Sequence, residues 1–387
     1  MNSPRIAVIG AGVGGLACAR GLQVHGRSVT VFEREGSAFA RWQGGMLDLH
    51  APTGQAALRS VGLFDEFRAV ARPEAQELRA VDPVTLALVH HEQPGEDEYF
   101  APEIDRGQLR ELLLGSLADG TVHWGHPVDG VTAQEDGTAR VRFGDGTTEV
   151  FDLVVGADGA WSRTRPVLSA ATPSYTGTTL VETFLDDVDT RHPALADLIG
   201  RGSLVAGVGA RMLGAQRNSG GHVRVYAELE GVPLDWHEAA GLDLADTEAV
   251  RAHLLTRFEG WHEGLLDLLR RSDGGFANRS IHVLPTGHSW GHVPGVTLLG
   301  DAAHLLPPHG IGANLALIDG ADLATAVATH DVLDDAVRAF EKVMLTRAKA
   351  AGEADAEMMA MMDDEKTRDI GAARQFMNDR MLGAEPA

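Results

Sequence analysis

The sequence of 387 residues is poor in cysteine, in aromatic side chains and in long apolar runs. Its single cysteine, Cys18, excludes an intramolecular disulfide and a metal site built from thiolates, and there is no Cys-x-x-Cys redox pair. Aromatic residues make up only 5% of the chain, and no unbroken apolar run is long enough to span a bilayer. We therefore expect a soluble protein whose chemistry does not depend on cysteine.

Basic residues are also scarce, since 33 lysines and arginines face 55 aspartates and glutamates and give a formal net charge of −22. Such a charge repels phosphodiester backbones and anionic lipid headgroups, so neither nucleic acid nor a membrane is an expected partner. The N-terminus has no basic region and no cleavage site of a signal peptide, which favours a cytoplasmic location. We expect a monomer or weak homodimer that acts on a small molecule.

The start of the chain has the pattern of a nucleotide-binding unit of strand, helix and strand. Residues 5–9 form a short apolar run, residues 16–24 have helical apolar spacing, and residues 28–32 alternate as a strand does. A glycine-rich loop joins the first strand to the helix, where exposed N–H groups and the helix dipole favour an anion. We therefore expect a dinucleotide at this loop.

The loop is Gly10-x-Gly12-x-x-Gly15, and Gly14 lies within it. In this pattern the first glycine permits a tight turn, the second lets a pyrophosphate approach the backbone, and the third allows close helix packing. Glu33, at the end of the second strand, is placed to accept hydrogen bonds from an adenosine ribose and would repel a 2′-phosphate. These residues predict FAD or NAD in this pocket and disfavour NADP there.

No second complete glycine pattern follows, because the loops at residues 207–209 and 310–312 lack a third glycine. A reductase with two nucleotide-binding domains is therefore disfavoured. The remaining periodicities alternate between strands and helices. We expect helices at residues 52–61, from 106, at 247–270, beyond 312 and from 336, antiparallel strands at 121–152, buried strands at 151–155 and 296–299, a strand pair within 78–100, and further strands at 180–184, 203–208 and 222–229.

Three later segments, taken with the glycine loop, resemble the single-component aromatic hydroxylases, the class A flavoprotein monooxygenases. They are Asp105-Arg106, the run from Asp152 to Arg163 that contains Asp158-Gly159, and Gly300-Asp301-Ala-Ala-His304-Leu-Leu-Pro307-Pro308. Within this family the likeness is closest to the tetracycline-degrading monooxygenases, through Gly44 to His50, Glu103 to Arg110 and Gly300 to Pro308. The resemblance spans most of the chain.

The resemblance implies an α/β fold with a Rossmann-like FAD-binding domain of the GR2 type, a β-sheet substrate domain and a C-terminal helix. We expect a discontinuous FAD-binding domain from residues 1–70, 101–170 and 284–330, a substrate domain from residues 71–100 and 171–283, and a C-terminal helical segment from residues 331–387.

The resemblance also implies roles around FAD. Asp301 would accept hydrogen bonds from the ribityl hydroxyls, Gly300 would leave room for the cofactor, and Arg106 would approach the flavin. The loop after the prolines departs from the family pattern, although the backbone amides there could stabilise charge on reduced flavin. The expected cofactor-binding residues are Gly10, Gly12, Gly14, Gly15, Glu33, Arg34, Arg41, Asp48, Arg106, Asp158, Gly300, Asp301, Pro308, Gly310, Gly312, Ala313 and Asn314.

Expected substrate contacts are Glu182, Arg211, Arg224 and Pro307, although solvated strand faces or an internal ion pair explain the three charged residues equally well. Glu182 and Arg224 differ from the family type, so a polyketide or other polycyclic phenol is favoured over tetracycline. No metal and no catalytic base is assigned. His304 and His309 follow a strand, where histidines are more often structural than catalytic.

The resulting prediction is a monooxygenase in which NADPH or NADH transiently reduces FAD, oxygen adds at flavin C4a, and the resulting hydroperoxide hydroxylates an aromatic or polyketide-like molecule. A place in antibiotic biosynthesis or inactivation would suit such a substrate. Two alternatives stay open: an FAD-dependent oxidase or dehydrogenase without oxygen insertion, and a flavoprotein that sequesters its ligand.

Overall fold

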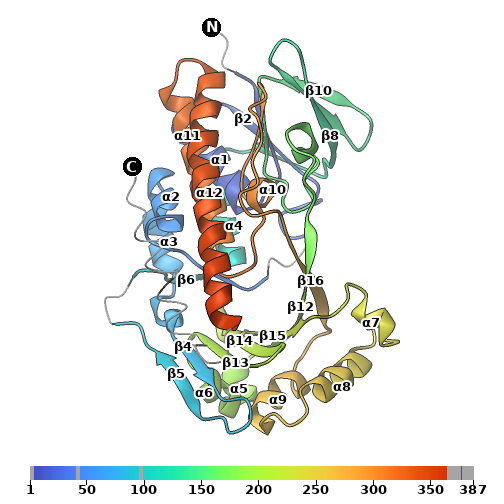
Figure 1. Cartoon of the computed structure of the whole chain (residues 1–387). Helices are drawn as coiled ribbons and strands as arrows, with labels where there is room; N and C mark the ends of the chain where they lie inside the picture. Colours follow the sequence, from blue (N-terminus) through green and yellow to red (C-terminus); the bar gives the residue numbers. More distant parts are fainter. Residues whose placement is uncertain (1–3, 41–43, 96–98, 364–375, 377–387) are drawn as a thin grey trace.

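A five-stranded parallel sheet forms one end of the molecule, as the computed structural model shows for residues 4–40, 44–95, 99–363 and 376 (Figure 1). Its strand order is β17-β11-β1-β2-β7. The central strands are buried on both faces, which explains their short, wholly apolar sequences. The strands are β1 (Ile6–Ile9), β2 (Val29–Glu33), β7 (Val122–Trp124), β11 (Leu153–Gly156) and β17 (Val296–Leu298).

The side chains of alternate residues of β1 pack in two different cores, one on each face of the sheet. Ala7 and Ile9 pack against a small antiparallel sheet of order β10-β9-β8, whereas Ile6 and Val8 pack against helices on the other face. The small sheet consists of β8 (Val128–Ala133), β9 (Ala139–Phe143) and β10 (Thr148–Phe151). The helical layer contains α1 (Val13–Val24), α2 (Gly54–Ser60), α3 (Phe64–Val70), α4 (Arg106–Gly115), α11 (Gly312–Thr329) and the first part of α12 (Leu333–Asp363).

Helices α1 and α11 approach each other very closely. A Cβ atom at Gly320 would lie 2.5 Å from the Gly14 carbonyl oxygen and 2.7 Å from the Cys18 nitrogen, and one at Gly21 would lie 2.6 Å from the Ala324 Cβ. Burial raises the pKa of the Cys18 thiol to about 12, so this cysteine packs as a small apolar residue. Glycine is therefore required where the two helices cross.

The other end of the molecule is a seven-stranded sheet of order β16-β12-β15-β14-β13-β4-β5. All neighbouring strands are antiparallel except β13 and β4. The strands are β4 (Leu78–Val81), β5 (Leu88–Glu92), β12 (Ser174–Leu185), β13 (Ser203–Val208), β14 (Arg211–Arg217), β15 (Val223–Glu230) and β16 (Ala277–Val283). The short pair β3 (Met46–Asp48) and β6 (Glu103–Asp105) lies between the two large sheets.

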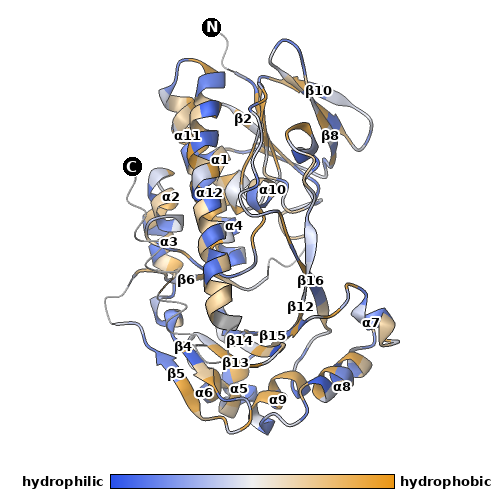
Figure 2. Cartoon of the chain, viewed as in Figure 1, coloured by the Kyte–Doolittle hydropathy of each residue, from blue (hydrophilic) through white to orange (hydrophobic). Residues whose placement is uncertain are grey.

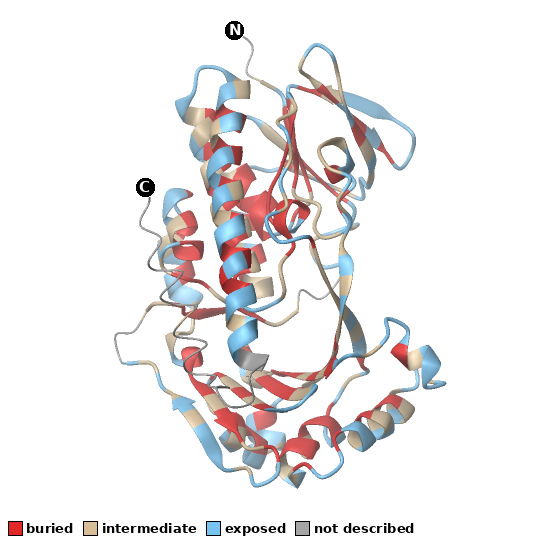
Figure 3. Ribbon diagram, viewed as in Figure 1, coloured by how far each residue is buried: buried red, intermediate tan, exposed pale blue. Residues whose placement is uncertain are grey.

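One face of this sheet is covered by short helices and encloses a second core (Figures 2 and 3). The helices are α5 (Val188–Arg191), α6 (Pro193–Ile199), α7 (Trp236–Ala239), α8 (Thr247–Arg257) and α9 (Glu263–Arg270). The opposite face turns toward the nucleotide-binding half, and α12 runs between the two ends (Figure 1). A short helix, α10 (Asp301–His304), follows β17.

The predicted α/β fold class is confirmed, and two local predictions are corrected. Residues 122–124, predicted as part of an antiparallel set, form β7, which pairs in parallel with β2. The helical segment predicted at residues 247–270 is divided. Residues 247–270 form two helices, because Gly260 turns the chain at φ +86° and the His262 side chain accepts a hydrogen bond from the Gly264 N–H to begin α9. The domain boundaries stay a prediction. No helix among the described residues is both long and apolar enough to cross a membrane.

The close crossing of α1 and α11 gives a stability prediction. Gly320→Ala should lower the free energy of unfolding by about 1–3 kcal/mol, since its methyl group has no room beside Gly14. Gly115→Ala is the matched control, because a Cβ there contacts nothing within 4 Å and alanine favours a helix. Urea unfolding followed by circular dichroism checks both variants, and equal midpoints would show that the crossing tolerates a side chain.

Candidate functional site

Three glycines of the loop after β1 are required by the protein itself. Gly10 has φ +107°, and a Cβ there would lie 2.4 Å from the Ala157 carbonyl oxygen. A Cβ at Gly14 would lie 2.7 Å from the Ala316 carbonyl oxygen, and one at Gly15 would lie 2.2 Å from the carbonyl oxygen of Gly10. These glycines let β1, α1 and α11 meet.

Gly12 is different, because a Cβ there would meet nothing within 4 Å. It is exposed and occupies the N-cap position of α1. The space in front of it therefore remains open at the N-terminus of a 12-residue helix, where unpaired N–H groups favour a phosphate. This open cradle fits the pyrophosphate expected from the sequence.

Glu33 lies beside this loop at the end of β2 and is buried. Its Oε2 accepts a hydrogen bond from the Ala11 N–H at 2.7 Å, and its Oε1 accepts one from the Glu35 N–H at 2.9 Å. Each carboxylate oxygen keeps further acceptor capacity for a ribose hydroxyl. The backbone contacts fix the carboxylate where the sequence pattern requires it.

Arg110, which sequence reasoning did not assign, also holds the loop. Its buried guanidinium donates to the Ala11 carbonyl at 3.0 Å and to the Ala38 carbonyl at 2.6 Å. Arg106 begins α4 one turn earlier, and its backbone N–H donates to the Gly45 carbonyl at 3.1 Å. The spacing of four residues between the two arginines on one helix was the available signal.

Two further arginines were expected near the cofactor. Arg34 is exposed, next to the buried Glu33. Arg41 lies outside the described residues.

Asp158 shapes the turn after β11. Its carboxylate accepts hydrogen bonds from the Ser162 hydroxyl at 2.6 Å, the Arg163 N–H at 2.7 Å and the Thr164 N–H at 3.2 Å. Arg165 then joins this turn to α10, since its Nε donates to the Ala302 carbonyl at 2.8 Å. The side chain of Asp158 is therefore engaged in the protein's own turn.

Asp301 follows β17 and has a different environment. Gly300 precedes it at φ +58°, and the Asp301 side chain makes no hydrogen bond within the part of the chain that the structure describes. One of its carboxylate oxygens lies 3.8 Å from the position of a Cβ on Gly312, at the start of α11. An exposed carboxylate beside a helix N-terminus fits the ribityl hydroxyls expected there.

Asp319 in the middle of α11 holds the turn at Gly300. Its buried carboxylate accepts hydrogen bonds from the Gly300 N–H at 3.1 Å and from Arg347 at 2.9 Å, and pairs with His304 Nε2 at 2.5 Å. Burial favours neutral forms, but the mutual attraction raises the pKa of His304 and lowers that of Asp319 overall. His304 thus has a structural role.

The loop expected to face the flavin ends in a clamp. Asn314 accepts hydrogen bonds from the N–H groups of His50 at 2.9 Å and Gly54 at 3.2 Å, and donates to the carbonyls of Asp48 at 2.7 Å and Gly310 at 3.0 Å. All four hydrogen bonds of its amide are therefore made within the protein. The backbone N–H groups of Gly312 and Ala313, at the start of α11, are the donors in this loop that can bind an anion.

The seven-stranded sheet turns a polar face toward these loops. Along β15, Val223, Val225, Ala227 and Leu229 belong to the second core, so the alternate residues Arg224, Tyr226 and Glu228 point to the other face. A Cβ at Gly45, next to β3, would lie 2.5 Å from the Tyr226 hydroxyl and 3.1 Å from Gln216 Oε1. The charge of His309 acts on Glu228 of this face, and we use the name chamber for the region bounded by Arg224, Tyr226, Glu228 and residues 307–310.

Glu182 and Arg224 both belong to this face. Glu182 Oε2 lies 2.6 Å from Arg279 Nε and 3.9 Å from Arg224 Nη2, and both Glu182 and Arg224 are buried. Burial raises the pKa of Tyr226 to about 12, and its hydroxyl donates to Gln216 at 3.3 Å. Tyr226 and Glu228 were missed by sequence reasoning, although each follows Arg224 at the two-residue period of a strand.

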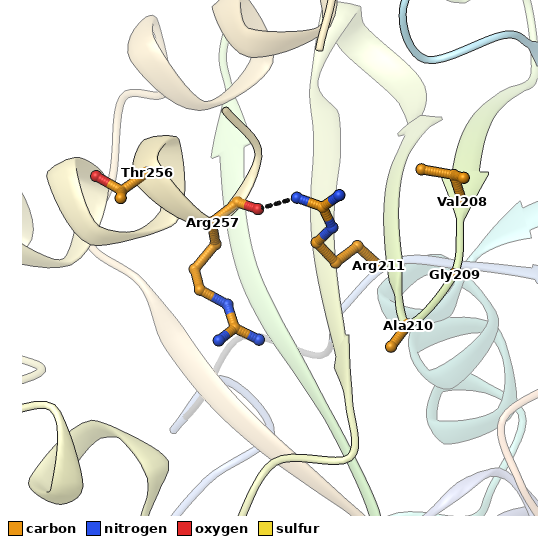
Figure 4. Close-up of a pocket in the computed structure, with 6 residues that line it drawn as sticks. All are labelled: Val208, Gly209, Ala210, Arg211, Thr256 and Arg257. Carbon is orange, nitrogen blue, oxygen red and sulfur yellow. Dashed lines mark hydrogen bonds between the residues drawn. The ribbon is translucent and has the colours of Figure 1, made fainter. Parts of the chain in front are cut away.

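Arg211 does not reach the chamber, contrary to expectation. It pairs across strands with Leu229, so it shares the face of the second core. Its guanidinium donates to the Arg257 carbonyl and lies 5.9 Å from the Trp261 ring centroid, in a solvent-open hollow beside Thr256 (Figure 4). Pro307 and Pro308 lie on the loop opposite the sheet, partly buried and exposed respectively.

Comparison with known proteins agrees with this geometry. The model of the FAD binding domain family matches residues 4–338. Monooxygenase penA of Penicillium thymicola is 30% identical over 90% of this chain and 92% of its own length.

Two solved structures share the fold. HpxO of Klebsiella pneumoniae, complexed with FAD and uric acid, has a TM-score of 0.81 at 20% identity and covers 98% of this chain and 97% of its own. The tetracycline destructase Tet(51) has a TM-score of 0.71 at 20% identity and covers 99% and 98%. The family match over residues 4–338 and the 30% identity to a monooxygenase over nearly its whole length establish that the chain belongs to the FAD binding domain family and is an FAD-dependent monooxygenase.

Proposed function

We propose that this enzyme hydroxylates an aromatic or polyketide-like small molecule, with NADPH or NADH as a transient reductant and molecular oxygen as co-substrate. The observation that carries the proposal is the polar face of β15, where Arg224, Tyr226 and Glu228 point away from the second core and Glu228 interacts with His309 of the loop that follows α10. A polar, partly buried face suits a ring that bears hydroxyl groups. HpxO with uric acid and the tetracycline destructase act as precedents for polar cyclic ligands in this fold.

The residues around the glycine loop after β1 and around the turn after β17 fit FAD. Gly12 leaves the α1 N-terminus open to the pyrophosphate, Glu33 suits the ribose, and Asp301 suits the ribityl chain. Bound FAD supplies hydride acceptance and oxygen activation. The full proposed contact set is Gly10, Gly12, Gly14, Gly15, Glu33, Arg34, Arg41, Asp48, Arg106, Asp158, Gly300, Asp301, Pro308, Gly310, Gly312, Ala313 and Asn314.

The chain's own groups orient the substrate and supply charge. Tyr226, with its raised pKa, stays protonated at neutral pH; its hydrogen is donated to Gln216, so the hydroxyl oxygen can accept a hydrogen bond from a substrate hydroxyl. Arg224, which is buried beside Glu182, places a cation on the same face. We also propose Pro307 as a contact of the bound ring, and a cytoplasmic enzyme, a compartment that supplies NAD(P)H.

Gly12→Val tests the FAD site. The valine side chain would fill the open space before α1 without a protein clash, so FAD affinity should fall at least roughly tenfold while the free energy of unfolding of the apoprotein changes by about 1 kcal/mol or less. Gly14→Val should instead destabilise the apoprotein, since its Cβ has no room. Flavin titration and urea unfolding measure the two effects. Unchanged FAD binding by Gly12→Val would place the cofactor elsewhere.

The reaction itself is tested with uric acid, tetracycline and salicylate, each supplied with NADPH or NADH under isotopically labelled oxygen. We expect at least one compound to accelerate NAD(P)H oxidation and to gain one oxygen atom from the gas, as read by mass spectrometry. Loss of two hydrogens without oxygen gain would identify an oxidase or dehydrogenase. A compound that binds tightly but stays intact, without NAD(P)H consumption, would identify a sequestering protein.

A further inference from the structure

His309 and Asp355 form a carboxylate–imidazole pair at the chamber. His309 Nδ1 lies 2.6 Å from Asp355 Oδ1. The Asp355 side chain is only 5% exposed, whereas that of His309 is 30% exposed. The other ring nitrogen, Nε2, makes no hydrogen bond to any residue that the structure describes. One ring nitrogen is therefore fixed and the other is available.

The position of this pair is set by helix α12. Ala351 and Ala354 of α12 pack against Ile311 and Leu315, which follow His309. Gly310 turns the chain at φ +90° between the histidine and this apolar contact. Helix α12 therefore holds Asp355 against the loop of His309, although the two residues are 46 positions apart in sequence.

The substrate sheet faces His309 from the other side of the chamber. Burial raises the pKa of Glu228 on β15, and the positive charge of His309 opposes that effect, which places the two groups within electrostatic range of each other. Asp48 of β3 lies beside the neighbouring Gly310, 2.9 Å from the position of a Cβ there. Asp355 is thus the carboxylate in direct contact with the imidazole, while Asp48 lies beside the next residue and Glu228 lies on the facing strand.

We propose that His309, oriented by Asp355, accepts the proton of a substrate hydroxyl in the chamber. The proposal rests on the proposed function. The O–H bond breaks, its electron pair stays on the substrate oxygen, and the proton passes to His309 Nε2. The imidazolium is held by the Asp355 carboxylate, and its proton later leaves to water at the exposed edge of the ring.

This step makes chemical sense for a hydroxylase. A phenolate or enolate has more electron density at its ring carbons than the neutral hydroxyl compound, so it reacts more readily with an electrophilic oxygen. A positioned base contributes about 10²–10⁴-fold to a rate, and a carboxylate on the second nitrogen fixes the tautomer that a base requires. A pair that merely tied α12 to the loop would not need a partly exposed ring whose Nε2 makes no hydrogen bond to any described residue.

The test uses FAD-loaded enzyme and 4-nitrophenol, whose anion is yellow. In the wild type, bound 4-nitrophenol should ionise at a lower pH than the free compound, because the proton moves to His309. In His309→Asn and His309→Gln the ionisation should move upward by about one pH unit or more. Asp355→Asn should produce a smaller upward shift, since the ring remains but its charged form loses its carboxylate.

The matched control is His222→Asn. His222 Nδ1 also lies 2.6 Å from a carboxylate, that of Asp186, but it precedes β15 about 20 Å from Glu228 along the strand. It should leave the ionisation of 4-nitrophenol unchanged. FAD content and circular dichroism verify that each variant folds.

Turnover gives an independent measure. With the phenol from the panel that the wild type oxygenates fastest, His309→Asn should lose on the order of 10²-fold in kcat at neutral pH and recover when the pH exceeds the phenol's own pKa. A structural defect would not be rescued by alkali. The O-methyl ether, which has no proton to lose, should react equally slowly with both enzymes.

The outcomes separate the two proposals. A wild-type enzyme that neither binds 4-nitrophenol nor oxygenates any compound would overturn the proposed function and this inference together. A wild-type enzyme that oxygenates a phenol, combined with an unchanged ionisation pH and an unchanged kcat profile in His309→Asn, would overturn the inference alone.

Discussion

The contact between α1 and α11 is the constraint on which the rest of the site depends. Gly320 of α11 lies against Gly14 of α1, and the neighbouring Asp319 accepts the hydrogen bond from the Gly300 N–H. The turn at the Gly10 loop and the turn at Gly300, about 290 residues apart in sequence, are thereby both held by α11. A larger residue at the crossing would separate the glycine loop from Asp301, and a single cofactor could no longer span both.

The electrostatics of this region follow from the same helix. Asp319, His304 and Arg347 are joined in a buried ion network, in which each charge offsets the cost of burying the others. Removal of one partner would leave an unpaired buried charge, at a cost of about 3–5 kcal/mol. Because Arg347 belongs to α12, this network also sets where α12 lies. Asp355 is eight residues further along that helix, or about 12 Å. Helix α12 therefore contacts both the network at the Gly300 turn and the loop at the chamber.

Local patterns in the sequence were sufficient for the nucleotide-binding unit. The spacing of Gly10, Gly12 and Gly15 and the acid at Glu33 depend only on a strand, a turn and a helix that follow each other directly. The structure shows all of them in the expected places. Most of the predicted strands are also present, because strand alternation is a local property.

Contacts between distant elements could not be predicted in this way. Arg211 and Arg224 both lie on strands, but the face of each depends on the register between β14 and β15, which a single sequence does not reveal. The contacts of the Asn314 amide with the backbone at Asp48 and His50 also join segments more than 260 residues apart, which no local pattern reveals. The pairing of His309 with Asp355 likewise depends on where α12 packs.

The placement of the proposed base separates two tasks. In the proposed function, the sheet face that carries Arg224, Tyr226 and Glu228 determines which ring is bound. Side chains on this face can be substituted while the backbone of the strand stays the same. His309 instead belongs to the loop after α10, and packing between α11 and α12 holds this loop close to the turn at Gly300. The proposed proton removal would therefore occur at a fixed position beside the turn at Gly300, whatever molecule the sheet binds. A substitution on β15 should thus change KM and substrate choice, whereas one at His309 should change kcat and its pH dependence.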